Sequence, residues 1–107
     1  MLIKERETMP RVQFTITYGI KPELREQYIA FIKEMKEHFA ALGTKQYAVY
    51  EVRGKKNQFA EVFMTETIEE FDALEDNQDE RTQALVARLE RFLDSEGMKY
   101  TTLIELE

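Results

Sequence analysis

The sequence contains no cysteine and no tryptophan, and its single histidine is His38. Without cysteine, the chain has no disulfide, no thiolate ligand for zinc and no thiol nucleophile. It also lacks a glycine-rich phosphate-binding loop, a nucleophile elbow and the spaced histidines of metal sites. We therefore expect no metal and no cofactor.

Long apolar runs and an excess of positive charge are missing as well. No stretch approaches the roughly 18 apolar residues of a membrane helix, and the charged segment 1–10 does not resemble a signal peptide. The formal net charge is −6, whereas binding to nucleic acids and anionic membranes depends on lysine and arginine. These features predict no nucleic-acid partner, no membrane association and a cytoplasmic location.

Glycine and proline are scarce, and they mark boundaries between elements. The chain has four glycines and two prolines among 107 residues, of which 43% are hydrophobic. This size and composition predict one domain over residues 11–107 with its own core. Residues 1–10 are mostly charged and are expected to form a flexible N-terminal arm.

Alternation of apolar and polar residues predicts strands in two regions, and composition predicts a hairpin in a third. Residues 11–19 and 100–106 each alternate with a period of two. Residues 44–65 consist of two runs rich in aromatic and β-branched residues around a loop with Gly54, which is typical of a hairpin. Both faces of this hairpin are apolar, so both faces of the sheet need cover.

Apolar residues at spacings of three and four predict helices. Pro22 begins a long helix that ends before Gly43. Thr67 and Glu70 have the spacing of a capping box at the start of a short helix.

A last helix follows this short helix. Its apolar stripe runs from Leu85 to Leu93, and it is expected to end at Gly97, with Met98 packing on Leu93.

The order of these elements predicts an α+β fold. It matches the ferredoxin-like split βαβ arrangement, with a four-stranded antiparallel sheet and helices on one face. One helical layer leaves the other face of the sheet bare. We therefore predict a homodimer that packs through the open sheet face.

The order of motifs resembles the dimeric α/β-barrel superfamily, which includes antibiotic-biosynthesis-type monooxygenases and haem-degrading relatives. The resemblance covers about residues 11–106. It lies in Gly19 followed by Pro22, in Gly43 before an aromatic strand, in residues 61–63 and in the helix start at residues 67–71. It implies a ferredoxin-like fold, a dimeric α/β barrel and a pocket between the sheet and the helices.

The catalytic residues of that superfamily do not match this sequence. Haem-degrading members place a tryptophan near the position of Phe63, a histidine where residues 76–79 stand and an asparagine on the first strand. The resemblance therefore implies a fold and a pocket but no particular activity.

Three residues are candidates for a site. Glu61 lies between Phe59 and Phe63 on one strand face, where it either faces a pocket as an acid or base, pairs with a basic group across the dimer or is exposed. Phe63 is a candidate for the same pocket. His38 borders the apolar stripe of the long helix and is either a general base or haem ligand, or, as we favour, a structural residue.

Two other groups of residues have simpler interpretations. The acidic run from Glu66 to Glu80 lacks the glycine-centred spacing of a calcium loop and is interpreted as a solvated helix face. Most tyrosines are expected in the core or the interface, although each could line a cavity. They are Tyr18, Tyr28, Tyr47, Tyr50 and Tyr100.

Two functions are compatible with these patterns. The first is a dimeric α/β-barrel protein that binds a small apolar or aromatic molecule between sheet and helices, with monooxygenase-like chemistry as the activity suggested by the resemblance. The alternative is a non-catalytic structural or interaction module with a filled core. A cavity of several hundred Å³ distinguishes the first from the second.

Overall fold

The computed structural model describes residues 10–44, 46–76 and 79–106. The predicted arm, residues 1–10, lies outside the described residues except for Pro10. The elements follow the order β1 (Val12–Ile20), η1 (Pro22–Leu24), α2 (Arg25–Ala41), β2 (Gln46–Glu51), β3 (Gln58–Thr65), α3 (Ile68–Asp76), α4 (Glu80–Glu90) and β4 (Leu93–Ile104). None of these helices is long and apolar enough to cross a membrane.

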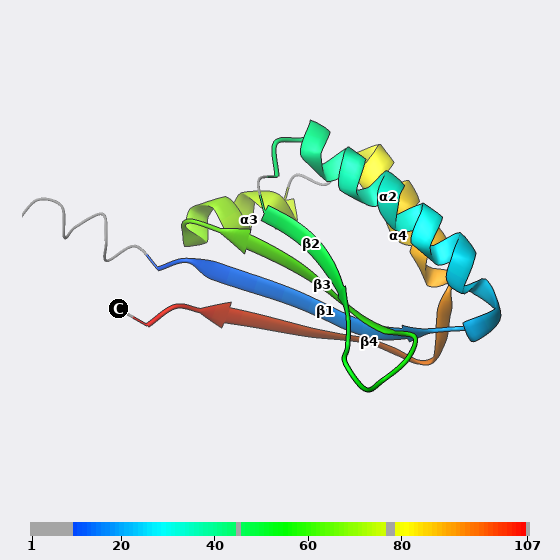
Figure 1. The fold of residues 1–107 in the computed structure, drawn as a ribbon. Coiled ribbons are helices and arrows are strands. Elements are labelled where there is room, and N and C mark those ends of the chain that lie inside the picture. The colour runs from blue at the N-terminus through cyan, green and yellow to red at the C-terminus, as the bar shows by residue number, and fades with distance from the viewer. Residues whose placement is uncertain (1–9, 45, 77–78, 107) are drawn as a thin grey trace, which may run out of the picture.

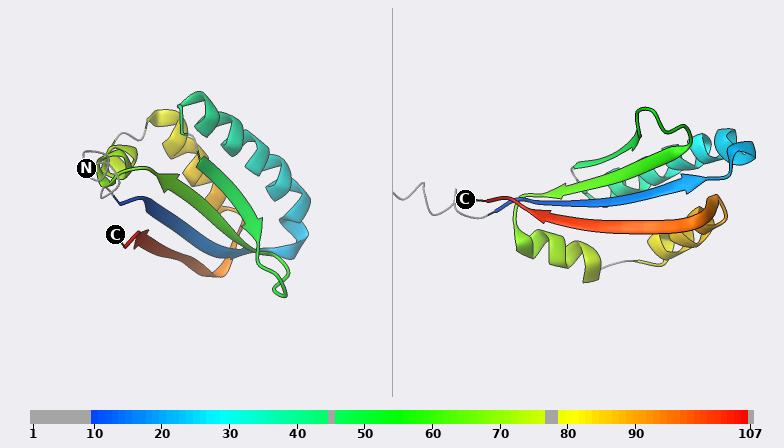
Figure 2. Two further views of the ribbon diagram at one scale, coloured as in Figure 1. Left: turned by 60° about the vertical axis from the view of Figure 1, so that its left-hand side comes forward. Right: turned by 90° about the horizontal axis from the view of Figure 1, so that it is seen from below.

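The four strands form one antiparallel sheet in the order β2-β3-β1-β4. The helices α2, α3 and α4 lie on one side of it (Figure 1; Figure 2). This arrangement is the predicted ferredoxin-like α+β fold. The two central strands, β1 and β3, are the first strand and the second half of the hairpin, as the split βαβ order requires.

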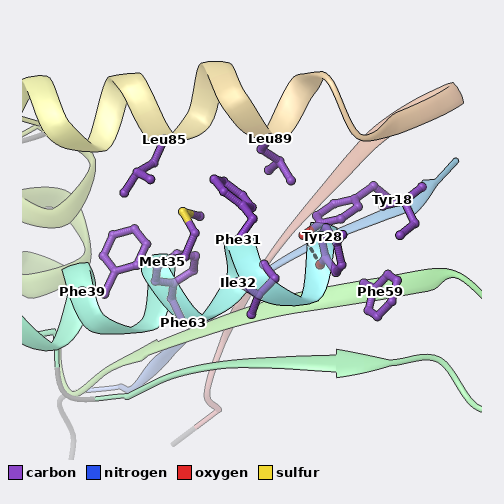
Figure 3. Close-up of a cluster of buried hydrophobic side chains, with 11 residues drawn as sticks. Tyr18, Tyr28, Phe31, Ile32, Met35, Phe39, Phe59, Phe63, Leu85 and Leu89 are labelled. Atoms are coloured by element: carbon purple, nitrogen blue, oxygen red, sulfur yellow. Dashed lines mark hydrogen bonds between the residues drawn. The ribbon is translucent and has the colours of Figure 1, made fainter. Parts of the chain in front are cut away.

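The core lies between the sheet and the pair α2 and α4. Alternate residues of β1 and β3 point toward the helices, which follows from the period of two in a strand. Figure 3 shows the aliphatic side chains Leu85 and Leu89 of α4 pointing toward Phe31 and Met35 of α2. Each of these four residues is at most 2% exposed.

Both later helices begin at side-chain caps. Thr67 Oγ1 accepts a 3.1 Å hydrogen bond from the backbone N–H of Glu70, as the capping-box spacing predicted. The Glu70 carboxylate accepts from the backbone N–H of Glu66 at 3.0 Å, one residue before the expected donor. Asp79 caps α4 by accepting from the backbone N–H of Thr82 at 2.8 Å.

The predicted end of the last helix at Gly97 is wrong. The helix α4 ends at Glu90, and Leu93 already belongs to β4, where it pairs with Ile20 of β1. Gly97 lies within β4 with a positive φ of 78°, close to the register shift between β1 and β4. Leu93 is apolar because it packs against the core from β4. Its position happens to continue the helical spacing of apolar residues in α4, so the sequence pattern extended the helix beyond Glu90.

The outer face of the sheet carries no helix among the described residues. The pairing places Tyr50, Ala60 and Thr17 side by side on this face, and Leu103 beside Gln13. Tyr50 is 58% exposed and Leu103 is 51% exposed.

A candidate ligand-binding cavity

A cavity of about 930 Å³ lies between the inner face of the sheet and the helices α2, α3 and α4. Aromatic, aliphatic and methionine side chains supply most of its wall. They include Phe14, Ile16, Phe63, Met98 and Tyr100 from the sheet, Met35 and Phe39 from α2, Phe71 and Leu74 from α3, and Val86 and Leu89 from α4. Pockets for small organic molecules have this size and this apolar character.

Glu61 supplies a carboxyl group to the wall of this cavity. Its side chain is 1% exposed, so the predicted alternative of an exposed Glu61 is wrong. The Tyr18 hydroxyl donates to Oε2 at 2.7 Å, and the Tyr47 hydroxyl donates to Oε1 at 2.8 Å. The hydroxyls of Tyr18 and Tyr28 are 2.6 Å apart, so Tyr28 extends the chain of hydrogen bonds. We call Glu61, Tyr18, Tyr28 and Tyr47 the carboxyl–tyrosine cluster.

Strand pairing explains how this cluster forms. Glu61 of β3 pairs with Ile16 of β1 on one side and with Val49 of β2 on the other. Tyr18 and Tyr47 lie two residues along from these partners, on the same face of the sheet. Such diagonal neighbours lie within reach of long side chains.

The cluster holds its carboxyl group without a cationic partner. Among the described residues, Glu61 forms no ion pair with lysine, arginine or histidine. Burial raises the pKa of Glu61, and the hydrogen bonds from Tyr18 and Tyr47 oppose this rise. Burial and the neighbouring Glu61 carboxyl group raise the pKa of the Tyr18 and Tyr47 hydroxyls. The tyrosines therefore remain neutral donors.

Phe63 lies next to this cluster and lines the cavity. Its ring centroid is 4.7 Å from that of Tyr47 and 5.2 Å from that of Phe39. The aromatic packing fixes the Tyr47 ring, whose hydroxyl then reaches Glu61.

His38 is not part of the cavity wall. Its Nε2 atom lies 2.7 Å from Thr82 Oγ1 and 3.6 Å from Asp79 Oδ1, which places the ring between α2 and the start of α4. The structure therefore brings Glu61 and Phe63 together and places His38 at a helix–helix contact.

The roles of Tyr18, Tyr28 and Tyr47 were not assigned from the sequence. Their hydrogen-bond partners are 10 to 43 residues away along the chain. The contact of Tyr47 with Glu61 could have been predicted from the register of the hairpin. Pairing Gln46–Glu51 with Gln58–Thr65 places Tyr47 diagonally across from Glu61. No group of three or more metal-ligating side chains is found within the described residues.

Comparison with known proteins supports the fold of the chain. No protein-family model and no curated protein sequence matches the chain. Solved structures do match it. A protein of Caulobacter crescentus CB15, provisionally described as an antibiotic biosynthesis monooxygenase, has a TM-score of 0.77 at 12% identity, covering 94% of this chain and 93% of that chain.

Two further structures show the same similarity. A conserved protein of Methanosarcina mazei Go1 has a TM-score of 0.75 at 14% identity, covering 94% of this chain and 96% of that chain. A NIPSNAP-like domain protein of Burkholderia xenovorans has a TM-score of 0.70 at 12% identity, covering 90% of this chain and 85% of that chain. This chain shares the fold of these solved structures.

Proposed function

We propose that this chain, which shares the fold of the dimeric α/β-barrel superfamily, binds a small, mostly apolar or aromatic molecule in the cavity between its sheet and helices. The observation that carries this proposal is the cavity of about 930 Å³ with the buried carboxyl group of Glu61 on its wall. A buried carboxyl group on an apolar wall is an unusual arrangement, and it suits the recognition of one polar group on an otherwise apolar ligand.

Glu61 is the residue to which we assign chemistry. Burial raises its pKa, so the group holds a proton at pH values where an exposed carboxyl group has lost it. A carboxyl group with a raised pKa is suited to act as a general acid or base. Tyr18 and Tyr47 hold one oxygen each, so the carboxyl group is fixed before a ligand arrives. We assign Glu61 to proton transfer with the bound molecule, in an enzyme whose substrate supplies the reactivity and whose cavity supplies orientation and exclusion of water. The monooxygenase-like structural neighbour favours this class of reaction.

The alternative function, a non-catalytic module with a filled core, receives less support. A filled core leaves no space of several hundred Å³, whereas this chain has a cavity of about 930 Å³.

We also propose that the protein is a homodimer through the outer face of its sheet. Tyr50 and Leu103 lie on this face and are each more than half exposed. Exposed apolar groups on a sheet face without a helical layer favour burial against a second copy. The superfamily fold supports the same assembly.

A fluorescence experiment tests ligand binding in the cavity. N-phenyl-1-naphthylamine is a neutral apolar probe whose emission increases in an apolar site, and we expect it to bind the purified protein. Val86→Phe places a larger side chain on the cavity wall and should lower the probe affinity at least about tenfold, since overpacking an apolar site is unfavourable.

The matched control is Ala87→Phe. It places the same side chain on the exposed surface of α4 and should leave the affinity unchanged. Equal affinities for the wild-type protein and Val86→Phe would show that the probe binds elsewhere, and the proposal would fail.

A further inference from the structure

The described residues that line the cavity carry acidic groups and no basic group. Four glutamates, Glu61, Glu66, Glu70 and Glu75, contribute to its wall and rim, and no described lysine, arginine or histidine does. Glu61 is buried, whereas the other three are exposed. All the ionisable side chains among the described lining residues are therefore acidic.

The arginines of the neighbouring helix α4 do not balance this charge. Arg88 donates two 3.0 Å hydrogen bonds to the carboxylate of Glu34 on α2, and Arg81 donates to the same carboxylate at 3.4 Å. Both guanidinium groups therefore form ion pairs that connect α2 and α4, and neither arginine lines the cavity.

We infer that the ligand of this cavity is a cationic amine with an apolar or aromatic body, and that its ammonium group binds Glu61. This inference rests on the proposed function and names the chemical class of the ligand. Each carboxylate oxygen of Glu61 accepts one hydrogen bond from a tyrosine and keeps acceptor capacity for an ammonium N–H group. A cation supplies the positive charge that Glu61 lacks among its described partners, and burial strengthens the attraction.

The apolar wall suits the remainder of such a ligand. The rings of Phe14, Phe39 and Phe63 line the cavity on the sheet and helix sides. Aromatic faces attract ammonium groups and also pack against aromatic bodies. The exposed glutamates at the rim attract cations from solution, because clefts lined by one sign of charge focus the field.

The same arrangement disfavours two other ligand classes. An anionic ligand would meet four carboxylates and no basic side chain among the described wall residues. A hard metal ion requires several oxygen ligands, whereas this wall offers one buried carboxylate among aromatic, aliphatic and methionine side chains.

Three probes of the same ring system test the inference. They are 1-naphthylmethylamine, 1-naphthalenemethanol and 1-naphthoate, which carry a cation, a neutral hydroxyl and an anion. The chain has no tryptophan, so naphthalene emission is recorded without indole interference. At about pH 8, we expect the amine to bind at least about tenfold more tightly than the alcohol, because a nearby ammonium group favours the ionised form of Glu61. The naphthoate should bind most weakly.

Two variants assign the effect to Glu61. Glu61→Gln keeps hydrogen-bonding atoms for the tyrosines and removes the charge, so the amine should bind as weakly as the alcohol while the affinity for the alcohol is retained. Glu75→Gln changes the net charge by the same amount at the rim and should lower the amine affinity by no more than about threefold, because exposed charges are screened.

The possible failures are distinguishable. If the alcohol or the naphthoate binds as tightly as the amine, and Val86→Phe weakens that binding, the cavity binds ligands but the inferred class is wrong. The same conclusion follows if Glu61→Gln leaves the amine affinity unchanged. If no probe binds, or if Val86→Phe leaves the binding of every probe unchanged, the proposed function fails together with the inference.

Discussion

The Tyr47 hydroxyl donates a 2.8 Å hydrogen bond to Glu61 Oε1, and it does so from the neighbouring strand, 14 residues away in the sequence. Tyr18 makes the matching bond to Oε2 from the other side. Neutral donors on both flanks hold a buried carboxyl group that has no cationic partner among the described residues.

Tyr47→Phe should raise the pKa of Glu61 further and destabilise the protein. The variant removes one of the two hydrogen bonds that oppose the effect of burial, and it leaves a buried acceptor without its donor. We expect the free energy of unfolding in urea to fall by about 1–3 kcal/mol. Tyr50→Phe, at an exposed position on the same strand, is the control and should change the stability little. A Tyr47→Phe protein as stable as the wild type would contradict the structural role of this bond.

Glu61→Gln should become relatively more stable as the pH rises. The pKa of Glu61 in the folded protein lies above its ordinary value of 4.5, so the native state binds this proton more tightly than the unfolded chain. Its contribution to stability is complete below about pH 4.5 and is lost as the pH rises through the folded pKa. The variant has no such proton.

The measurement is urea unfolding of both proteins at several values between about pH 4.5 and pH 8. The free energy of unfolding of Glu61→Gln minus that of the wild type should increase over this range. The other titrating groups cancel in the difference. A constant difference would show that Glu61 has an ordinary pKa.

Glu51→Gln should show the opposite dependence on pH. Arg25 donates hydrogen bonds of 2.6 and 2.8 Å to the Glu51 carboxylate, and the backbone N–H of Asn57 donates a third. These bonds lower the pKa of Glu51 to about 2. The stabilisation is present above the ordinary pKa and is lost as the pH falls through about 2.

We therefore expect Glu51→Gln to be less stable than the wild type at neutral pH, and we expect this difference to shrink as the pH falls toward about 2. Thermal unfolding followed by circular dichroism measures both values. A difference that persists unchanged at the acidic end would show that packing, and not charge, links Arg25 to the hairpin.

His38→Ala should lower stability and leave ligand binding intact. His38 bonds to Thr82 Oγ1 at 2.7 Å, and Thr82 is 5% exposed, so the variant leaves a buried hydroxyl without this partner. We expect a loss of about 1–3 kcal/mol in urea unfolding. The affinity for N-phenyl-1-naphthylamine should stay within about twofold of the wild type, since His38 is not in the cavity wall. If the affinity for the probe fell by more than about tenfold, His38 would take part in ligand binding and this prediction would be wrong.

Leu103→Glu should yield a monomer if the outer face of the sheet is the dimer interface. A carboxylate buried in an apolar interface loses its hydration, which disfavours association. Light scattering after size-exclusion chromatography measures the mass. Ile29→Glu is the control, because Ile29 is 42% exposed on α2 and lies outside the sheet. A wild-type monomer, or a Leu103→Glu dimer, would refute this interface.

The sequence determined the parts of this protein that depend on local interactions. The alternation in Val12–Ile20, the hairpin around Gly54 and the cap at Thr67 each involve residues close together in the chain. Periodicity and capping act over a few residues, so they can be recognised without a structure. Together with the short connections, they were sufficient to predict the topology of the sheet.

Only the tertiary structure decided which residues meet. The helical spacing of apolar residues extended to Leu93, but Leu93 lies in a strand and pairs with Ile20. This partner is far away in the sequence, so the local pattern could not reveal the pairing. The sequence marked Glu61 as a candidate but left its environment open. The tyrosines that surround it come from β1, α2 and β2, and the cavity is bounded by elements from the whole chain. Burial, hydrogen-bond partners and cavity shape are properties of packing, and local sequence patterns do not encode them.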